Sequence, residues 1–207
     1  MSKTAILELD GKKYEFPVIV GTENEVAIDI DKLRSASGAI TIDPGYKNSG
    51  SCTSEITFLD GEEGILRYRG YSIEDLADKA DFLEVSYLLI FGELPTAAQL
   101  EKFENDIRNY TLVSEEMKSI IDGFPRTAHP MGVLASLTSA LTAFNPKSVN
   151  PHNEKEMYDA VCKTMGKFLV IATWTYRKTM GYPLNYYDNT KGYVDNFMRL
   201  MFELPTG

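Results

Sequence analysis

Turn signals and helix caps divide this sequence into two parts at about residue 70. In the first part, the dipeptides Asp10-Gly11 and Asp60-Gly61 each lie between β-prone runs. Such dipeptides supply the positive φ angles that tight hairpin turns need. A short helix over 31–36, closed by Gly38, is expected between them. We therefore predict that residues 1–70 form a β-rich region with two hairpins, which pair Ala5–Leu9 with Lys13–Val18 and Glu55–Leu59 with Ile65–Arg69.

The second part, residues 71–207, carries the signals of helices. Three helix starts place a capping oxygen three residues before an acid or amide, in the pairs Ser72/Asp75, Asp81/Glu84 and Thr96/Gln99. Later helices are predicted over Ser114–Ile121, Pro130–Phe144, Glu154–Met180 and Gly192–Phe202, with Gly166 as a candidate interruption of the longest. Core positions are predicted for one apolar stripe, formed by Val133, Leu134, Leu137 and Leu141. The fold class is therefore mainly α.

Charge and cysteine content exclude several classes of protein. The chain has 21 Lys and Arg against 30 Asp and Glu, a net charge of −9, so we expect no binding to nucleic acid or to an anionic membrane. No signal peptide can form, because Glu8 and Asp10 interrupt the apolar start, and a cytoplasmic location is expected. Cys52 and Cys162 have no Cys-x-x-Cys partner, which argues against disulfides and a metal site.

Few residues offer catalytic or binding chemistry. The two histidines, His129 before Pro130 and His152 in a polar loop, are interpreted as structural and solvated. No glycine-rich phosphate loop is present in the sequence. Lys163 and Lys167 lie four residues apart on one helix face and could clamp an anion. On spacing alone, a solvated helix face is the simpler interpretation of that pair.

The longest recognisable motif is the run from Ser51 to Ala77, which reads SCTSEITFLDGEEGILRYRGYSIEDLA. This run resembles the early signature of citrate synthases. The resemblance continues in family order through Asp43-Pro44-Gly45, Phe91–Pro95, Ala128–Met131 and Asn196–Phe202. It implies that this chain corresponds to the N-terminal half of a family member, in which residues 71–207 are the helical part of the large domain. The β-rich start is similar to that of the bacterial hexameric type.

The resemblance also implies an activity for the whole enzyme. Citrate synthases condense acetyl-CoA with oxaloacetate and water to give citrate and CoA, using two histidines and an aspartate and no cofactor. Those catalytic motifs are expected beyond residue 207, and neither His129 nor His152 matches them. The chain is thus expected to have no catalytic residues of its own. A 2-methylcitrate synthase, which takes propionyl-CoA, is an alternative, as is a regulatory or oligomerisation module without catalysis.

Hexameric members of the family bind NADH at an allosteric site, and some of its residues have counterparts here. Lys167 and Thr111 match the family, Lys163 replaces an arginine, and Tyr110 replaces a histidine. Asn145 and Thr206 stand where the family has a tyrosine and a reactive cysteine, and Arg108 matches an arginine only across a one-residue gap. Lysine lacks the bidentate fork of arginine, so weak or absent NADH inhibition is expected.

The resemblance further implies a homo-oligomer, a dimer or in the complete enzyme a hexamer. The ending Leu204–Gly207 is interpreted as a chain cut at a loop, which would leave apolar stripes such as Val133, Leu137 and Leu141 exposed. Exposed apolar patches drive association. We therefore expect a dimer or a larger species.

Overall fold

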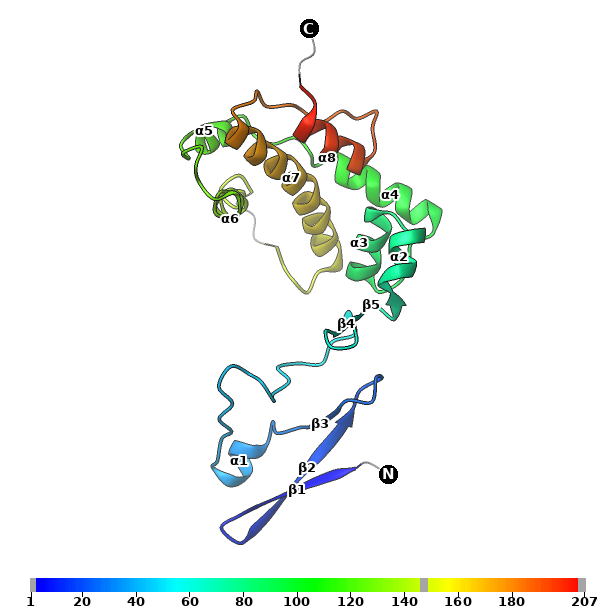
Figure 1. The fold of residues 1–207 in the computed structure, drawn as a ribbon, viewed down its shortest axis with the longest axis vertical. Coiled ribbons are helices and arrows are strands. Elements are labelled where there is room, and N and C mark those ends of the chain that lie inside the picture. Colours follow the sequence, from blue (N-terminus) through cyan, green and yellow to red (C-terminus); the bar gives the residue numbers. More distant parts are fainter. Residues whose placement is uncertain (1–2, 146–148, 205–207) are drawn as a thin grey trace. The chain divides into compact units, whose positions relative to one another are not determined.

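The computed structural model describes residues 3–145 and 149–204, and the chain divides into two compact units between Glu55 and Ile56 (Figure 1). Helices dominate the described residues, which confirms the mainly α class. The switch from strand and turn signals to helix signals near residue 70 marks where the main run of helices begins in the sequence. The second hairpin precedes that point and yet belongs to the helical unit.

The first unit is built on a three-stranded antiparallel sheet of β1 (Thr4–Leu9), β2 (Lys12–Val20) and β3 (Val26–Ile28). The first predicted hairpin is confirmed, and Asp10 and Gly11 take φ angles of 49° and 74° in its turn. The short helix is confirmed as α1 (Leu33–Ser37), closed by Gly38 in the left-handed conformation. Strand β3 was not expected from the sequence. Only Phe16 and Leu33 among the described apolar side chains of this unit are buried.

The second unit opens with β4 (Thr57–Asp60), β5 (Ile65–Tyr68) and β6 (Tyr71–Ser72). The second hairpin is confirmed, but the expected positive φ at Asp60-Gly61 is wrong. The Asp60 carboxylate instead accepts from the backbone N–H groups of Glu62 and Glu63, both at 3.0 Å, and the positive φ falls on Gly64. A side-chain turn therefore replaces the backbone turn that the dipeptide suggested.

Three capped helices follow, namely α2 (Ile73–Lys79), α3 (Phe82–Phe91) and α4 (Ala97–Arg108). All three predicted caps are confirmed, and the Asp81/Glu84 and Thr96/Gln99 pairs form complete capping boxes. Arg69, at φ 50° in the turn between β5 and β6, donates from Nη2 to the carbonyl of Leu89 at 3.1 Å. That contact ties the small sheet to the last turn of α3 and supplies the positive charge that a helix C-terminus favours.

The remaining helices are α5 (Glu116–Asp122), α6 (Pro130–Ala140), α7 (Glu154–Met180) and α8 (Tyr193–Phe202). Helix α7 runs without a break through Gly166. The expected extension of α6 to Phe144 is wrong, because residues 141–144 form tighter i to i−3 turns. Thr142 donates from Oγ1 to the Ser139 carbonyl at 2.8 Å, which favours this tightening over a further α-helical turn.

The main core lies where α7 meets α5, α6 and α8. Its fully buried members include Trp174, Ile171, Leu137 and Leu200. The expectation of an exposed stripe on α6 is wrong, because Val133 and Leu137 are buried in this core at 6% and 0% exposure. The apolar side chains that α6, α7 and α8 do expose are others, including Met131, Phe168, Val194 and Met198.

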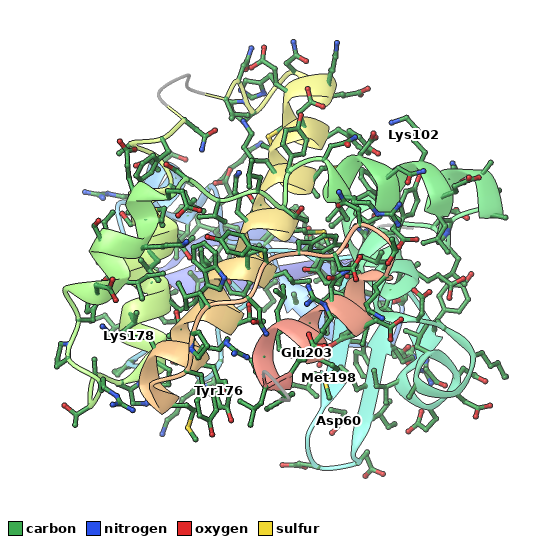
Figure 2. The ribbon with its side chains drawn as sticks, turned by 90° about the horizontal axis from the view of Figure 1, so that it is seen from above. Asp60, Lys102, Tyr176, Lys178, Met198 and Glu203 are labelled. Atoms are coloured by element: carbon green, nitrogen blue, oxygen red, sulfur yellow. The ribbon has the colours of Figure 1, made fainter. Side chains whose placement is uncertain are left out.

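Arg177 joins the end of α7 to the end of α8. Figure 2 labels Tyr176 on the first of these helices and Glu203 just after the second. Its side chain is fully buried, and Nη1 donates to the carbonyls of Leu200, Met201 and Glu203 at 3.3, 3.3 and 2.8 Å. Carbonyls at a helix C-terminus carry partial negative charge, so they stabilise the guanidinium. Among the described residues, no helix is long and apolar enough to cross a membrane.

Candidate functional site

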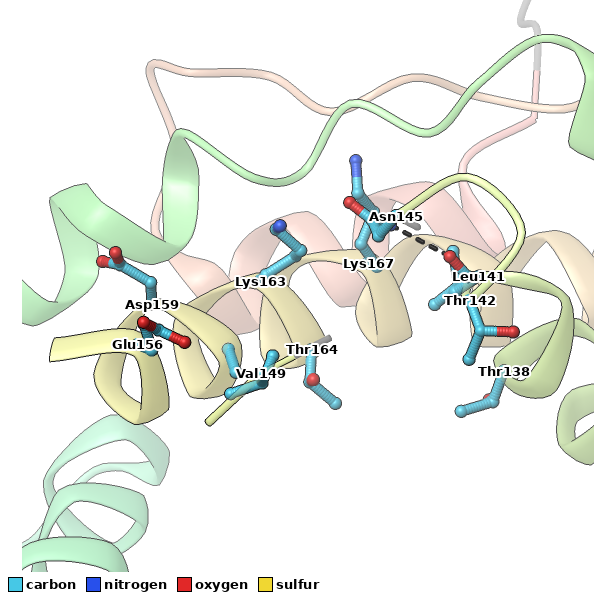
Figure 3. Close-up of a pocket in the computed structure, with 11 residues that line it drawn as sticks. Thr138, Leu141, Thr142, Asn145, Val149, Glu156, Asp159, Lys163, Thr164 and Lys167 are labelled. Carbon is cyan, nitrogen blue, oxygen red and sulfur yellow. Dashed lines mark hydrogen bonds between the residues drawn. The ribbon is translucent and has the colours of Figure 1, made fainter. Parts of the chain in front are cut away.

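A groove along α7 gathers the charged residues that the sequence singled out. Lys163 and Lys167 project from one face of α7, and α6 with the turns after it supplies the opposite wall (Figure 3). The volume of the groove is about 810 Å³. We call it the lysine groove, and it is lined by Thr138, Leu141, Thr142, Asn145, Val149, Glu156, Asp159, Ala160, Lys163, Thr164 and Lys167.

The two lysines differ in what holds their ammonium groups. The Nζ atom of Lys163 lies 5.6 Å from the ring centre of Tyr110, a cation–π contact. Lys167 donates a hydrogen bond to the carbonyl of Leu112. Within the described part of the chain, neither amine lies within 4 Å of a carboxylate. Burial, and then the charge of Lys163, lower the pKa of Lys167. Glu156 and Asp159 also line the groove, so its charged side chains are two lysines and two carboxylates.

Thr111 lies apart from the lysines. It is buried, its Oγ1 donates to the Arg108 carbonyl at 2.9 Å, and it lines a second cavity of about 710 Å³. This second cavity, here called the aromatic pocket, is lined by Asn105, Arg108, Asn109, Thr111, Leu112, Val113, Val170, Trp174, Tyr186, Tyr187 and Asn189. Leu112 lines the aromatic pocket while its carbonyl binds Lys167, so residues 110–113 separate the two cavities.

Of the expected site residues, the structure brings Lys163, Lys167 and Asn145 together in one groove, with Tyr110 against Lys163. Asn145 donates from Nδ2 to the Leu141 carbonyl at 3.0 Å, the dashed line in Figure 3. Thr206 lies outside the described residues. The hydroxyls of Thr138, Thr142 and Thr164 were not expected in the groove. For the first two, the signal was the spacing of Thr138, Thr142 and Asn145, which places them on successive turns of one side of α6 and its extension.

Within the described residues, neither histidine has the hydrogen-bond partners typical of a catalytic side chain. His129 caps α6, where Nδ1 accepts from the Met131 backbone N–H at 3.2 Å. His152 is exposed in the turn before α7. Among residues 3–145 and 149–204, no group of three or more His, Cys, Asp or Glu side chains could hold a metal ion. The described residues that come together as a candidate site are therefore those of the lysine groove, and the histidines are not among its lining residues.

Comparison with known proteins shows which family the chain is related to. The family model described as "Citrate synthase, C-terminal domain" matches residues 45–206. The chain belongs to the citrate synthase family. It is 44% identical over 202 residues to citrate synthase from Corynebacterium glutamicum and 40% identical over 202 residues to citrate synthase 1 from Mycobacterium tuberculosis. Each match covers 98% of this chain but only 46% and 47% of the relative, so the chain spans about half the length of these citrate synthases.

Solved citrate synthases share the fold. The ternary complex of the Thermoplasma acidophilum citrate synthase with carboxymethyl coenzyme A and oxaloacetate matches with a TM-score of 0.73 and 26% identity, over 81% of this chain and 44% of that one. Citrate synthase from Thermotoga maritima matches with a TM-score of 0.65 and 28% identity, over 78% and 42%. The family resemblance of the sequence is thereby confirmed.

Proposed function

We propose that this chain is the N-terminal part of a citrate synthase, and that the complete enzyme condenses acetyl-CoA with oxaloacetate and water to give citrate and CoA. The observation that carries this proposal is the continuous similarity over 98% of the chain at 44% identity. The helical unit supports it, because its arrangement of helices matches an enzyme whose solved complex holds a CoA derivative and oxaloacetate.

The 207 residues alone are expected to be inactive. General acid–base catalysis needs a titratable group within hydrogen-bond reach of a reacting atom and positioned by a neighbour. The Nδ1 atom of His129 accepts the hydrogen bond that caps α6, and His152 lies exposed in a turn. We would measure release of the CoA thiol from acetyl-CoA and oxaloacetate with this chain and with the longest protein that its reading frame encodes. Turnover by the longer protein alone supports the proposal, and turnover by the 207-residue chain contradicts it.

The choice of acyl donor separates the nearest alternative. A 2-methylcitrate synthase takes propionyl-CoA, which differs from acetyl-CoA by one methylene. Such a difference changes specificity by only about 10–200-fold, so both donors must be compared as kcat/KM on the same preparation. A higher value for propionyl-CoA would replace the proposed substrate. Absence of turnover with both donors, at any length of the chain, would favour a regulatory or oligomerisation module.

The lysine groove supports a second role, the binding of an anionic nucleotide. Its two lysines and three threonine hydroxyls suit phosphate oxygens. The carboxylates of Glu156 and Asp159 lie further along the same helix. NADH is the expected ligand from the family, and weak binding is expected because lysine replaces arginine at 163 and asparagine replaces tyrosine at 145. Fluorescence titration of the 207-residue chain with NADH, beside Lys163→Ala and Lys167→Ala, tests this role. Equal affinity for NADH in all three proteins would contradict a nucleotide-binding role of the lysine groove.

A homo-oligomer is the proposed state, a dimer with the hexamer as a further possibility in the complete enzyme. The outer face of α6 supports it, because Met131 is 63% exposed and the small residues Ala135, Ser136 and Ser139 are exposed beside it. Small side chains allow a second helix to approach closely. Sedimentation equilibrium of the chain and of Ala135→Glu tests this contact, since a charge there should give monomers. A monomeric unmodified chain at micromolar concentration would contradict the proposal.

A further inference from the structure

Among the described residues, the amine of Lys167, like that of Lys163, has no carboxylate within 4 Å. It lies in the lysine groove, half-buried, and its hydrogen bond goes to the backbone carbonyl of Leu112. Lys79, Lys102, Lys118 and Lys178 instead each pair with a carboxylate. A neutral amine keeps N–H groups and one lone pair. It can therefore hold the Leu112 contact and still present that lone pair to the groove.

The charges that face this amine come from two elements. On α7, Lys163 lies one turn before it, and Glu156 and Asp159 line the groove further along the same helix. On the segment after α4, the Tyr110 ring lies against Lys163. The wall that α6 and its following turns contribute is neutral, formed by Thr138, Leu141, Thr142 and Asn145.

This environment shifts the Lys167 amine toward its neutral form. Burial disfavours the charged form, and the positive charge of Lys163 adds repulsion, so the pKa of Lys167 is lowered. The same combination of desolvation and a neighbouring cation activates nucleophilic lysines in enzymes. Lys102 is the opposite case, because its hydrogen bond with Asp106 raises its pKa.

We propose that Lys167 is a modification site, acylated on its side-chain nitrogen by acyl thioesters that enter the lysine groove. The Nζ lone pair attacks the thioester carbonyl, the C–N bond forms, and the C–S bond breaks. The amine proton passes to the departing sulfur, so the products are an amide on Lys167 and a free thiol. Acyl-CoA as the physiological donor rests on the proposed function, but the reactivity of the amine does not.

Acylation would change what the groove binds. The amide of Lys167 carries no charge, which leaves Lys163 as the cation of the pair. An anionic nucleotide would then lose one of its two charge-assisted contacts. The modification thus opposes anion binding at the same site and couples it to the supply of acyl thioester.

The test is peptide mass spectrometry of the folded 207-residue chain after incubation with a small acetyl thioester, S-acetyl-N-acetylcysteamine, and separately with acetyl-CoA. We expect the Lys167 peptide to acetylate faster than the peptides of Lys102 and of Lys155, which is exposed at the start of α7. The rate at Lys167 should rise at a lower pH than the rate at Lys155. Each unit by which a pKa is lowered raises the neutral fraction about tenfold at a pH below both values.

The variant Lys163→Gln tests the cause without touching the reacting group. Removal of the neighbouring charge should move the pH profile of Lys167 to higher pH and slow its acetylation near pH 7. Lys155→Gln is the matched control and should leave that profile unchanged. Acetylation of Lys167 no faster than of Lys155 by either donor, or a profile that Lys163→Gln does not move, overturns the proposal. Reaction with the small thioester but not with acetyl-CoA retains the site and counts against CoA as its donor.

Discussion

A Cβ atom added at Gly166 in α7 would lie 2.7 Å from the carbonyl oxygen of Ile107 in the last turn of α4. It would also lie 3.0 Å from the carbonyl carbon of Tyr110. Gly166 therefore marks where α4 and the segment after it cross α7 at close range. That crossing positions Tyr110 beside Lys163 and the Leu112 carbonyl beside Lys167. The glycine is a packing requirement of the site rather than a helix interruption.

The variant Gly166→Ala should destabilise the chain. Alanine is the better helix former, but the new methyl group meets backbone atoms that cannot move aside, and overpacking of this kind costs about 1–3 kcal/mol. Gly132→Ala in α6 is the matched control, because its Cβ would meet nothing within 4 Å. The control should gain about 0.5–1 kcal/mol from helix propensity. Urea unfolding measures both changes, and a Gly166→Ala midpoint at or above that of the unmodified chain would contradict the crossing.

Local sequence signals predicted those parts of the fold that depend on neighbouring residues. The capping pairs of α2, α3 and α4 and both hairpins could be predicted because each depends on a few adjacent side chains. The end of α6 could not, because back-bonding by Thr142 and Asn145 competes with the apolar period. The burial of Val133 and Leu137 was predicted from the apolar period of α6, and it is completed by the packing of α7 over that stripe.

The site was predictable to a similar extent. The spacing of Lys163 and Lys167 fixes them to one face of a helix, and the structure places both in one groove. Thr111 is next to Tyr110 in sequence but lines another cavity, and both residues lie in the i to i−3 turns that follow α4, whose side-chain directions the sequence pattern did not predict. The role of Arg177 was missed because its acceptors come from residues 183–203, which no local pattern links to it.

Arg177→Met should be among the most destabilising substitutions of the helical unit. The methionine would fill much of the space but would leave the carbonyls of Pro183, Leu200 and Met201 without this donor. The Glu203 carbonyl would keep its hydrogen bond from Asn185. Buried groups left unpaired cost about 1–3 kcal/mol each, so a loss of about 3 kcal/mol or more is expected. Lys178→Met is the control, because Lys178 makes a surface contact with Asp122 at 3.0 Å. That pair contributes about 0–1 kcal/mol. Similar unfolding midpoints for the two variants would refute the assignment.

The contact between Asp106 and Tyr158 predicts a pH dependence of stability. The Tyr158 hydroxyl donates to the Asp106 carboxylate at 2.7 Å, and Lys102 donates to the same carboxylate. These hydrogen bonds, that of Lys102 first, hold the pKa of Asp106 below its ordinary value of 3.8. The stabilisation is therefore present above pH 3.8 and is lost as the pH falls through the lower folded-state pKa.

Asp106→Asn should lower the free energy of unfolding by about 1 kcal/mol near neutral pH, the usual contribution of one hydrogen bond. The difference from the unmodified chain should stay constant between about pH 5 and 9 and shrink as the pH falls below 4. Tyr158→Phe removes one donor only and should show a smaller difference in the same window. Urea midpoints across this pH range measure both. A difference that persists undiminished into acid would show that the carboxylate charge is not involved.

The two cysteines should differ sharply in reactivity. Cys162 is fully buried in α7, and burial raises its pKa to about 11. At pH 8 about one part in a thousand of such a thiol is thiolate, the reactive form. Cys52 is exposed and should react with an aromatic disulfide reagent at the rate of a free thiol. We therefore expect one fast thiol in the folded chain, none in Cys52→Ser, and two after unfolding in urea. Two thiols of equal rate in the folded chain would place Cys162 outside the contact between α4 and α7, and with it the packing that positions the lysine groove.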